Sequence, residues 1–232
     1  MATVILLRHG RSTANVAGVL AGRSPGVDLD DVGRAQAEAL PARLEHVRID
    51  RIVSSPLERC RQTVAPLAVD RDLPVHVEDD LAEVDYGSWT GRPLKDLAGE
   101  PLWRVVQAHP SAAVFPEGEG LADVSVRSVA AIRRQLAVLT ADVGKDAYLL
   151  VCTHGDVIKA VLADALGLHL DGYQRIVAGP ASLSVIRYTE LRPFVERVND
   201  TGDLEVLRPP PPADSPTDES DESDATPGGV TR

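Results

Sequence analysis

The chain has 232 residues, enough for one sizeable α/β domain, and its aromatic content of 3% leaves Val, Leu, Ile and Ala to build the core. Its net charge of −11 argues against nucleic acid or an anionic membrane as the main partner, although a local arginine cluster can still bind a small anion. With only two cysteines, the chain cannot be a disulfide-built scaffold, and a reducing compartment suits it.

No segment predicts secretion or membrane insertion. The first apolar run, Val4–Leu7, is too short for a signal peptide, and the residues before it carry no basic side chain. No apolar run approaches the roughly 20 residues of a transmembrane helix. We therefore expect a soluble, cytoplasmic protein.

The run Val4–Leu7 ends in Arg8, His9 and Gly10. An unbroken apolar run predicts a strand buried on both faces, as in parallel sheets. Because apolar neighbours cannot hold Arg8 and His9 in the core, we expect this pair just beyond the carboxyl end of the strand, where open α/β sheets bind ligands. The following residues, 11–28, predict a loop or short helix and then a turn-rich segment.

Asp30 predicts the N-cap of a helix that continues to Leu44, and Pro41 should kink or weaken it. A second buried strand is expected at 50–54. Ser55 and Pro56 then predict the cap and the first position of another helix. Its apolar positions are Leu57, Cys60, Val64 and Leu67.

The middle of the chain predicts shorter elements. A third strand is expected at 73–77, followed by a loop at 83–91, whose glycines disfavour a regular helix. Short helices are expected within 93–107 and a second loop at 110–120. The apolar periodicity of 121–143 predicts a long amphipathic helix.

A second apolar run, 147–152, predicts another buried strand, and it too is followed by a histidine and a glycine, His154 and Gly155. A helix is expected from 156 to 166, with Gly167 as its C-terminal cap. The alternation of strands and helices predicts a three-layer α/β sandwich with a mainly parallel central sheet flanked by helices.

Two last strands are expected at 183–188 and 194–198, antiparallel at an edge of the sheet. We assign residues 1–208 to one domain. Residues 209–232 begin with four prolines and contain six acidic residues and one arginine, a net charge of −5 that leaves −6 for the domain. Their apolar content of one Val and two Ala is too low to offset the entropy of ordering, which predicts a disordered acidic Pro/Ser-rich tail.

Four segments carry residues suited to chemistry: 8–10, 58–63, Glu83 and 153–155. Taken singly, segment 8–10 can be a strand end, 58–63 a solvated helix face, Glu83 a surface acid, and 153–155 a helix cap or a core histidine. Because the carboxyl ends of parallel strands share one edge of a sheet, we expect the two His-Gly pairs to meet over one phosphate.

In this order and spacing, the four segments resemble the histidine phosphatase superfamily, which includes the cofactor-dependent phosphoglycerate mutases. The resemblance spans Val4 to Tyr188 and implies a phosphoglycerate mutase-like fold that needs no metal or cofactor. The matching motifs are Arg8-His9-Gly10 with Asn15, the stretch 54–63, the acid loop 83–91, and Thr153-His154-Gly155.

The resemblance implies that His9 is the nucleophile and carries the phosphoryl group as phosphohistidine. Its other ring nitrogen should donate to a backbone carbonyl near Gly10, which fixes the tautomer. A phosphoryl group in transfer spreads negative charge over three oxygens. Arg8 and Arg59 can meet that charge with planar donors that stay protonated.

The remaining site residues also follow from the resemblance. His154, if protonated, adds a third cation, and Asn15 is a neutral donor to the same oxygens. The helix that begins at Gly155 directs its positive end toward the anion. Glu83 serves as general acid for the leaving alcohol and then as base for water, with Asp85 as the second choice.

Three features depart from the family pattern or lie beside it. Arg11 stands where many members carry an acid or glutamine, and we favour a solvated arginine over a cation at the mouth of the site. The stretch 116–120 only loosely matches the family's Pro-x-Gly-Glu-Ser, because Gly120 replaces the serine, so its role stays open. Glu58 is expected to cap or pair at the start of its helix.

The acid loop is similar to that of the phosphatase branches, and the segment after it carries only Arg92, Lys95 and Arg104 as basic residues. We therefore predict a metal-independent phosphomonoesterase that acts on a small phosphorylated metabolite, without nucleic-acid or membrane partners. A homodimer through the edge strands is a further possibility. The alternatives are phosphoglycerate mutase-type phosphoryl transfer and a non-catalytic phosphate-binding regulatory module.

Overall fold

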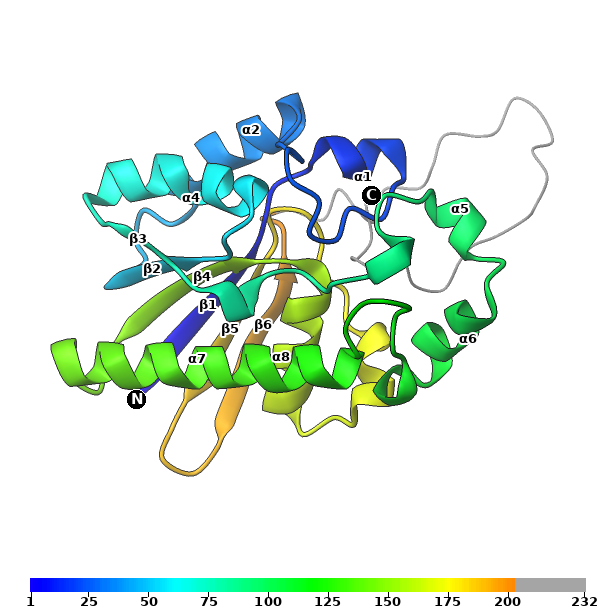
Figure 1. The fold of residues 1–232 in the computed structure, drawn as a ribbon. Helices are drawn as coiled ribbons and strands as arrows, with labels where there is room; N and C mark the ends of the chain where they lie inside the picture. The colour runs from blue at the N-terminus through cyan, green and yellow to red at the C-terminus, as the bar shows by residue number, and fades with distance from the viewer. Residues whose placement is uncertain (203–232) are drawn as a thin grey trace, which may run out of the picture.

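The computed structural model describes residues 1–202, so the predicted tail at 209–232 lies outside the described residues. A six-stranded sheet has helices on both faces (Figure 1). The strands are β1 (Ala2–Arg8), β2 (Arg51–Ser54), β3 (Val75–Val77), β4 (Tyr148–Thr153), β5 (Leu183–Tyr188) and β6 (Pro193–Asp200). The α-helices are α1 (Thr13–Ala17), α2 (Asp31–Glu38), α3 (Leu40–Arg43), α4 (Glu58–Arg71), α5 (Leu94–Leu97), α6 (Pro101–Ala108), α7 (Leu121–Val143) and α8 (Gly155–Leu166). Short 3₁₀ helices are η1 (Asp79–Leu81), η2 (Gly87–Trp89), η3 (Pro110–Ala112) and η4 (Leu170–Arg175).

The strand order is β3-β2-β4-β1-β5-β6. The first four of these strands run parallel, while β5 is antiparallel to β1 and β6 is antiparallel to β5. The three-layer architecture with a mainly parallel sheet and an antiparallel edge is therefore confirmed. The two apolar runs that precede the His-Gly pairs form β1 and β4, which are neighbours at the centre of the sheet.

Alternate residues of the central strands pack against different helices, which is why both faces of the sheet are covered. In β1, Ile5 and Leu7 belong to the cluster on the α3 and α4 side, whereas Val4 and Leu6 belong to the larger cluster with α7 and α8. Figure 1 shows α2 and α4 on one side of the sheet and α7 and α8 on the other. Both cysteines are buried and unpaired.

Several boundaries agree with the sequence. The helix α7 and the strand β5 have the predicted bounds, and α8 ends at Gly167, whose φ of 65° is the left-handed conformation that glycine adopts readily. No helix within residues 1–202 is long and apolar enough to cross a membrane.

The helix expected from Asp30 to Leu44 is divided into α2 and α3. Asp30 is the N-cap, and its carboxylate accepts a hydrogen bond from the Gly33 amide at 2.7 Å. The break falls at Ala39, just before Pro41, which has no N–H to continue the helical hydrogen bonding. The predicted weakening at this proline is confirmed.

The predicted start of α4 is wrong. The helix begins at Glu58 rather than Pro56, and its N-cap is Leu57 in an extended conformation. The Ser55 hydroxyl forms a hydrogen bond with Nε2 of His154 at 2.7 Å. Ser55 therefore belongs to the site described below, and the first turn of α4 starts two residues later.

Candidate active site

The two His-Gly pairs meet at the carboxyl edge of the central strands. The residues Arg8 and Thr153 are register partners in β1 and β4, and the His9 amide donates to the Thr153 carbonyl at 3.0 Å. The rings of His9 and His154 have centroids 5.2 Å apart. The expectation that these histidines face each other is confirmed, because adjacent parallel strands deliver both at the same edge.

Arg8 and His9 are more deeply placed than the sequence suggested. Arg8 is the last residue of β1 rather than a residue beyond it, and the exposed fractions of Arg8 and His9 are 1% and 4%. The expectation that this pair lies outside the core is wrong. The fold holds these polar groups with hydrogen bonds: Nη1 of Arg8 donates to the Ala178 carbonyl at 2.7 Å.

The orientation of His9 is set by its neighbour. Its Nδ1 lies 2.7 Å from the Gly10 carbonyl, which requires the proton on Nδ1 and leaves the lone pair on Nε2. A Cβ on Gly10 would lie 2.8 Å from the Gly33 carbonyl oxygen, so the backbone packs closely there. Burial, followed by the charges of Arg59 and Arg8, holds the pKa of His9 well below its usual value. The ring is therefore neutral at physiological pH.

Two buried guanidinium groups accompany His9. Burial lowers the pKa of Arg8 to about 10, so Arg8 still carries its charge near neutral pH. Arg59 comes from the first turn of α4, its Nε lies 3.4 Å from Nε2 of His9, and its Nη2 donates to the Gly22 carbonyl at 2.9 Å. Its Nη1 is buried and finds no hydrogen-bond partner among residues 1–202. This arrangement leaves donor capacity for an anion beside His9.

His154 is held between three groups. Its Nδ1 lies 3.2 Å from Nη2 of Arg59, which can only donate, so the ring proton is on Nε2 and faces the Ser55 hydroxyl. The Cys60 sulfur lies 3.4 Å from Nε2. Burial, followed by the charge of Arg59, lowers the pKa of His154 well below its usual value. His154 is thus neutral here, in contrast to the cationic form considered from the sequence.

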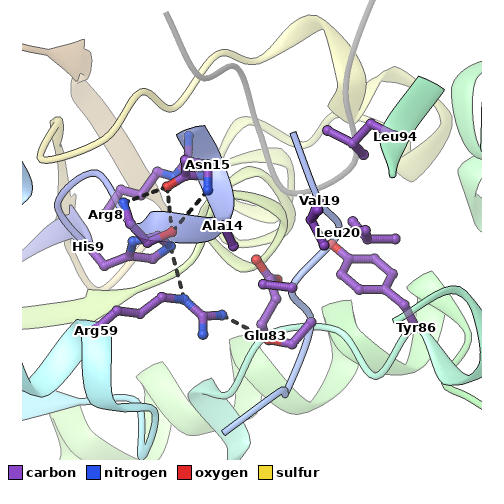
Figure 2. A pocket seen from close by; sticks show the side chains of 13 residues that line it. Arg8, His9, Ala14, Asn15, Val19, Leu20, Arg59, Glu83, Tyr86 and Leu94 are labelled. Atoms are coloured by element: carbon purple, nitrogen blue, oxygen red, sulfur yellow. Dashed lines mark hydrogen bonds between the residues drawn. The ribbon is translucent and has the colours of Figure 1, made fainter. Parts of the chain in front are cut away.

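Glu83 enters the same cleft from the loop after β3, with an exposed fraction of 3%. Burial and then the charge of Asp156 raise the pKa of Glu83 to about 7, against the opposing effects of Arg59 and Arg8. A carboxyl group with a pKa near neutrality can both release and accept a proton at physiological pH. Figure 2 shows Glu83 across the cleft from His9 and Arg8.

Asp156 is a buried acid close to the site that sequence reasoning missed. It lies in the first turn of α8, is 1% exposed, and accepts a hydrogen bond from the Tyr86 hydroxyl at 2.7 Å. Lys159 lies one turn further on, with its Nζ 3.4 Å from the same carboxylate. An acid directly after His154 and Gly155, in an otherwise apolar helix start, is the signal that could have identified it.

Asp85, the second choice for the acid, has a different role. Its carboxylate accepts a hydrogen bond from the Gly87 amide at 3.0 Å, and its side chain is not among those that line the cleft. It therefore closes the turn that follows Glu83. Glu58 is placed in the first turn of α4, where a negative charge complements the helix dipole.

An ion-pair network fixes the loop that carries Glu83. Arg127 of α7 binds both carboxylate oxygens of Glu119 at 2.9 Å and donates to the Glu83 carbonyl at 3.2 Å. Arg23 donates to the same Glu83 carbonyl at 2.9 Å and pairs with Glu119 at 2.8 Å. Glu119 also accepts from the Asp85 amide at 3.0 Å. The stretch 116–120, whose role the sequence left open, thus supports the acid loop.

The other predicted site residues lie around the cleft. Asn15 lines it, and its side-chain oxygen accepts from the amide and hydroxyl of Ser12. Gly155 begins α8 and is buried, directly after His154. Arg11, expected to be solvated rather than a cation at the mouth of the site, does not line the cleft; its side chain is partly exposed, and its Nε pairs with Asp30 at 2.7 Å.

The cleft formed by these residues has a volume of about 410 Å³, including the part that opens to solvent. In Figure 2, Arg8, His9, Arg59 and Glu83 gather at one end of the cleft, and the apolar side chains of Val19, Leu20 and Leu94 lie at the other. Within residues 1–202, no group of three or more His, Cys, Asp or Glu side chains is placed to hold a metal ion.

Comparisons with known proteins identify the family of this chain. The family model for the histidine phosphatase superfamily (branch 1) matches residues 4–201. Phosphoserine phosphatase 1 of Hydrogenobacter thermophilus is 30% identical over 207 residues, which cover 87% of this chain and 93% of that protein. The adenosylcobalamin/alpha-ribazole phosphatase of Salmonella typhimurium is 40% identical over 95 residues, 41% of this chain; in this alignment the chain spans 46% of that relative.

A solved structure, mycobacterial glucosyl-3-phosphoglycerate phosphatase complexed with VO3, has a TM-score of 0.77 and 26% identity, covering 86% of this chain and 99% of that one. The family model's match, residues 4–201, includes the central strands, the helices of both layers and every segment that contributes to the cleft. Since the family model also covers nearly the whole described chain, this protein belongs to the histidine phosphatase superfamily, branch 1.

Proposed function

We propose that this chain is a metal-independent phosphomonoesterase that acts through a phosphohistidine on His9, with a small phosphorylated metabolite as its substrate. One observation carries the proposal: a neutral imidazole presents its unprotonated Nε2 beside the guanidinium of Arg59, with the carboxyl group of Glu83 in the same cleft. Family membership and phosphatase relatives support the class of reaction.

In the first step, Nε2 of His9 attacks phosphorus while the ester P–O bond breaks. The protonated Glu83 donates its proton to the leaving alcohol. Arg8 and Arg59 balance the charge on the three phosphoryl oxygens, and Asn15 and the N-terminus of α8 at Gly155 add uncharged donors. Approach of the dianion raises the proton affinity of His154, which can then share in balancing this charge.

In the second step, Glu83 is a carboxylate and takes a proton from a water molecule. The oxygen of that water attacks phosphorus, the P–N bond to His9 breaks, and inorganic phosphate leaves. The electron pair of the broken bond returns to Nε2, and Glu83 is protonated again. The cycle consumes one water for each ester.

A quench experiment tests this proposal. Mixing the enzyme with a ³²P-labelled phosphate ester and stopping the reaction in alkali should trap a phosphohistidine that is lost on acid treatment. Peptide mapping should place the label on His9, and added chelator should leave turnover unchanged. Label on another residue, or activity that depends on a divalent metal, would contradict the mechanism.

Phosphoglycerate mutase-type transfer is separated from hydrolysis by product analysis. With 3-phosphoglycerate, a phosphatase releases inorganic phosphate and a mutase forms the 2-phospho isomer. We expect release of phosphate from a generic aryl phosphate to exceed any isomerisation, because the segment after the acid loop carries few cations. Isomerisation faster than hydrolysis would reverse this assignment.

The pH dependence should reveal the coupling of Glu83 to Asp156. Since Glu83 must be protonated to donate, and its pKa is about 7, kcat/KM should fall as the pH rises above about 7. Asp156→Asn removes a negative charge that raises this pKa, while keeping an acceptor for the Tyr86 hydroxyl. The pKa of Glu83 then falls, so the decline of kcat/KM should begin at lower pH. Above pH 7, kcat/KM of the variant should be about tenfold below that of the wild type.

The measurement is a pH profile of kcat/KM on one substrate, so that ionisation of the substrate affects both enzymes equally. Asp164→Asn, on the same helix and in an exposed pair with Arg133, is the matched control and should leave the profile unchanged. An Asp156→Asn profile that overlays the wild-type curve would show that Asp156 does not tune Glu83.

A further inference from the structure

The end of the cleft away from the phosphate site is built from uncharged groups. Apart from Tyr86, the ionisable side chains that line the cleft are all at the phosphate end: Arg8, His9, Arg59 and Glu83. Figure 2 shows Val19, Leu20, Leu94 and Tyr86 grouped on the far side of Glu83 from Arg8 and His9. The apolar lining consists of Ala14, Val19, Leu20, Ala21 and Leu94.

Backbone hydrogen bonds hold this apolar lining, which we call the apolar wall, in place. The segment 18–20 runs antiparallel to 91–94: the Leu20 amide donates to the Arg92 carbonyl at 3.0 Å, and the Gly91 amide donates to the Leu20 carbonyl at 2.8 Å. The Leu94 amide donates to the Gly18 carbonyl at 2.8 Å. These peptide groups satisfy each other, so the wall presents hydrocarbon side chains rather than free backbone donors to the cleft.

The basic side chains near the apolar wall either form ion pairs with acidic residues or lie outside the cleft. Arg23 pairs with Glu119, and Arg92 pairs with Glu100 at 2.7 Å. Lys95 follows Leu94 on α5 but is exposed and does not line the cleft. A second anionic group on a substrate would therefore lose its hydration against the wall without gaining a cation there.

We propose that the preferred substrates carry a single phosphoryl group on an apolar, uncharged alcohol, and that Val19 and Leu94 select this alcohol. This inference rests on the proposed hydrolysis at His9 and adds the class of ester that the cleft accepts. Esters whose alcohol carries a carboxylate or a second phosphate are poor substrates, because the wall cannot balance the extra charge.

Two probes of matched length test the selectivity: butyl phosphate and 3-carboxypropyl phosphate. Both release a primary alcohol, so the difficulty of the bond cleavage is similar, and the probes differ in a terminal carboxylate. We expect kcat/KM for butyl phosphate to exceed that for the carboxylate by about tenfold or more. Equal values, or a preference for the carboxylate, would refute the inference while leaving hydrolysis at His9 intact.

Leu94→Lys places a cation on the apolar wall and should raise kcat/KM for the carboxylate probe. The ratio of kcat/KM for butyl phosphate to kcat/KM for 3-carboxypropyl phosphate should then fall toward or below one. The matched control is Val138→Lys, the same kind of exchange at an exposed position of α7 that does not line the cleft. It should keep the wild-type ratio. A ratio unchanged in Leu94→Lys would also refute the inference. If neither probe is hydrolysed while an aryl phosphate still labels His9, the selectivity is refuted and the proposed function stands; if no ester labels His9, both fail.

Discussion

Replacing His9 with alanine is expected to lower kcat by about 10⁴-fold or more, because no other group among residues 1–202 presents an unprotonated nitrogen to the phosphate site in the same geometry. His154 cannot substitute, since its Nδ1 faces Arg59 and its Nε2 faces Ser55. The measurement is steady-state hydrolysis of an aryl phosphate, together with thermal unfolding to verify that the variant is folded.

The control for this experiment is His46→Ala, which removes a histidine whose side chain is 92% exposed and lies outside the cleft. It should retain wild-type turnover. Hydrolysis by His9→Ala within tenfold of wild type would show that His9 is not the nucleophile. Wild-type protein that binds phosphate esters without hydrolysing any of them would instead favour the non-catalytic regulatory module.

Replacing Glu83 with glutamine should produce a loss that depends on the leaving group. For an alkyl phosphate, the departing alkoxide needs a proton, so phosphorylation of His9 should slow by about 10²–10⁴-fold. For p-nitrophenyl phosphate, the departing phenolate is stable without a proton, so phosphorylation should be much less affected. Hydrolysis of the phosphohistidine still needs a base, and the intermediate should accumulate.

Rapid mixing of the Glu83→Gln variant with p-nitrophenyl phosphate should therefore give a burst of p-nitrophenolate, about one per enzyme, followed by slow turnover. Asp85→Asn is the matched control, because asparagine can still accept the hydrogen bond from the Gly87 amide. It should lose less than about tenfold on either substrate. Equal losses of Glu83→Gln on alkyl and aryl esters, without a burst, would remove Glu83 as the proton donor.

The amino-acid sequence determined the parts of this protein that depend on local pattern. Unbroken apolar runs identified the central strands β1 and β4, and their position beside each other explains why His9 and His154 meet. Periodicity gave the bounds of α7, and Asp30 and Gly167 marked the ends of helices through their capping chemistry. The strand and helix assignments need only neighbouring residues, so the sequence suffices to predict them, whereas the pairing of β1 with β4 joins distant segments and is established by the fold.

The tertiary structure alone decided the electrostatics of the site. Asp156 lies 73 positions along the chain from Glu83, and only folding brings its charge close enough to raise the pKa of that carboxyl group. In the same way, burial beside Arg59 keeps His154 neutral. Ser55, predicted to cap α4, instead forms a hydrogen bond with the ring of His154. Proton affinity depends on solvent exclusion and on charges contributed by distant segments, and neither is a property of local sequence.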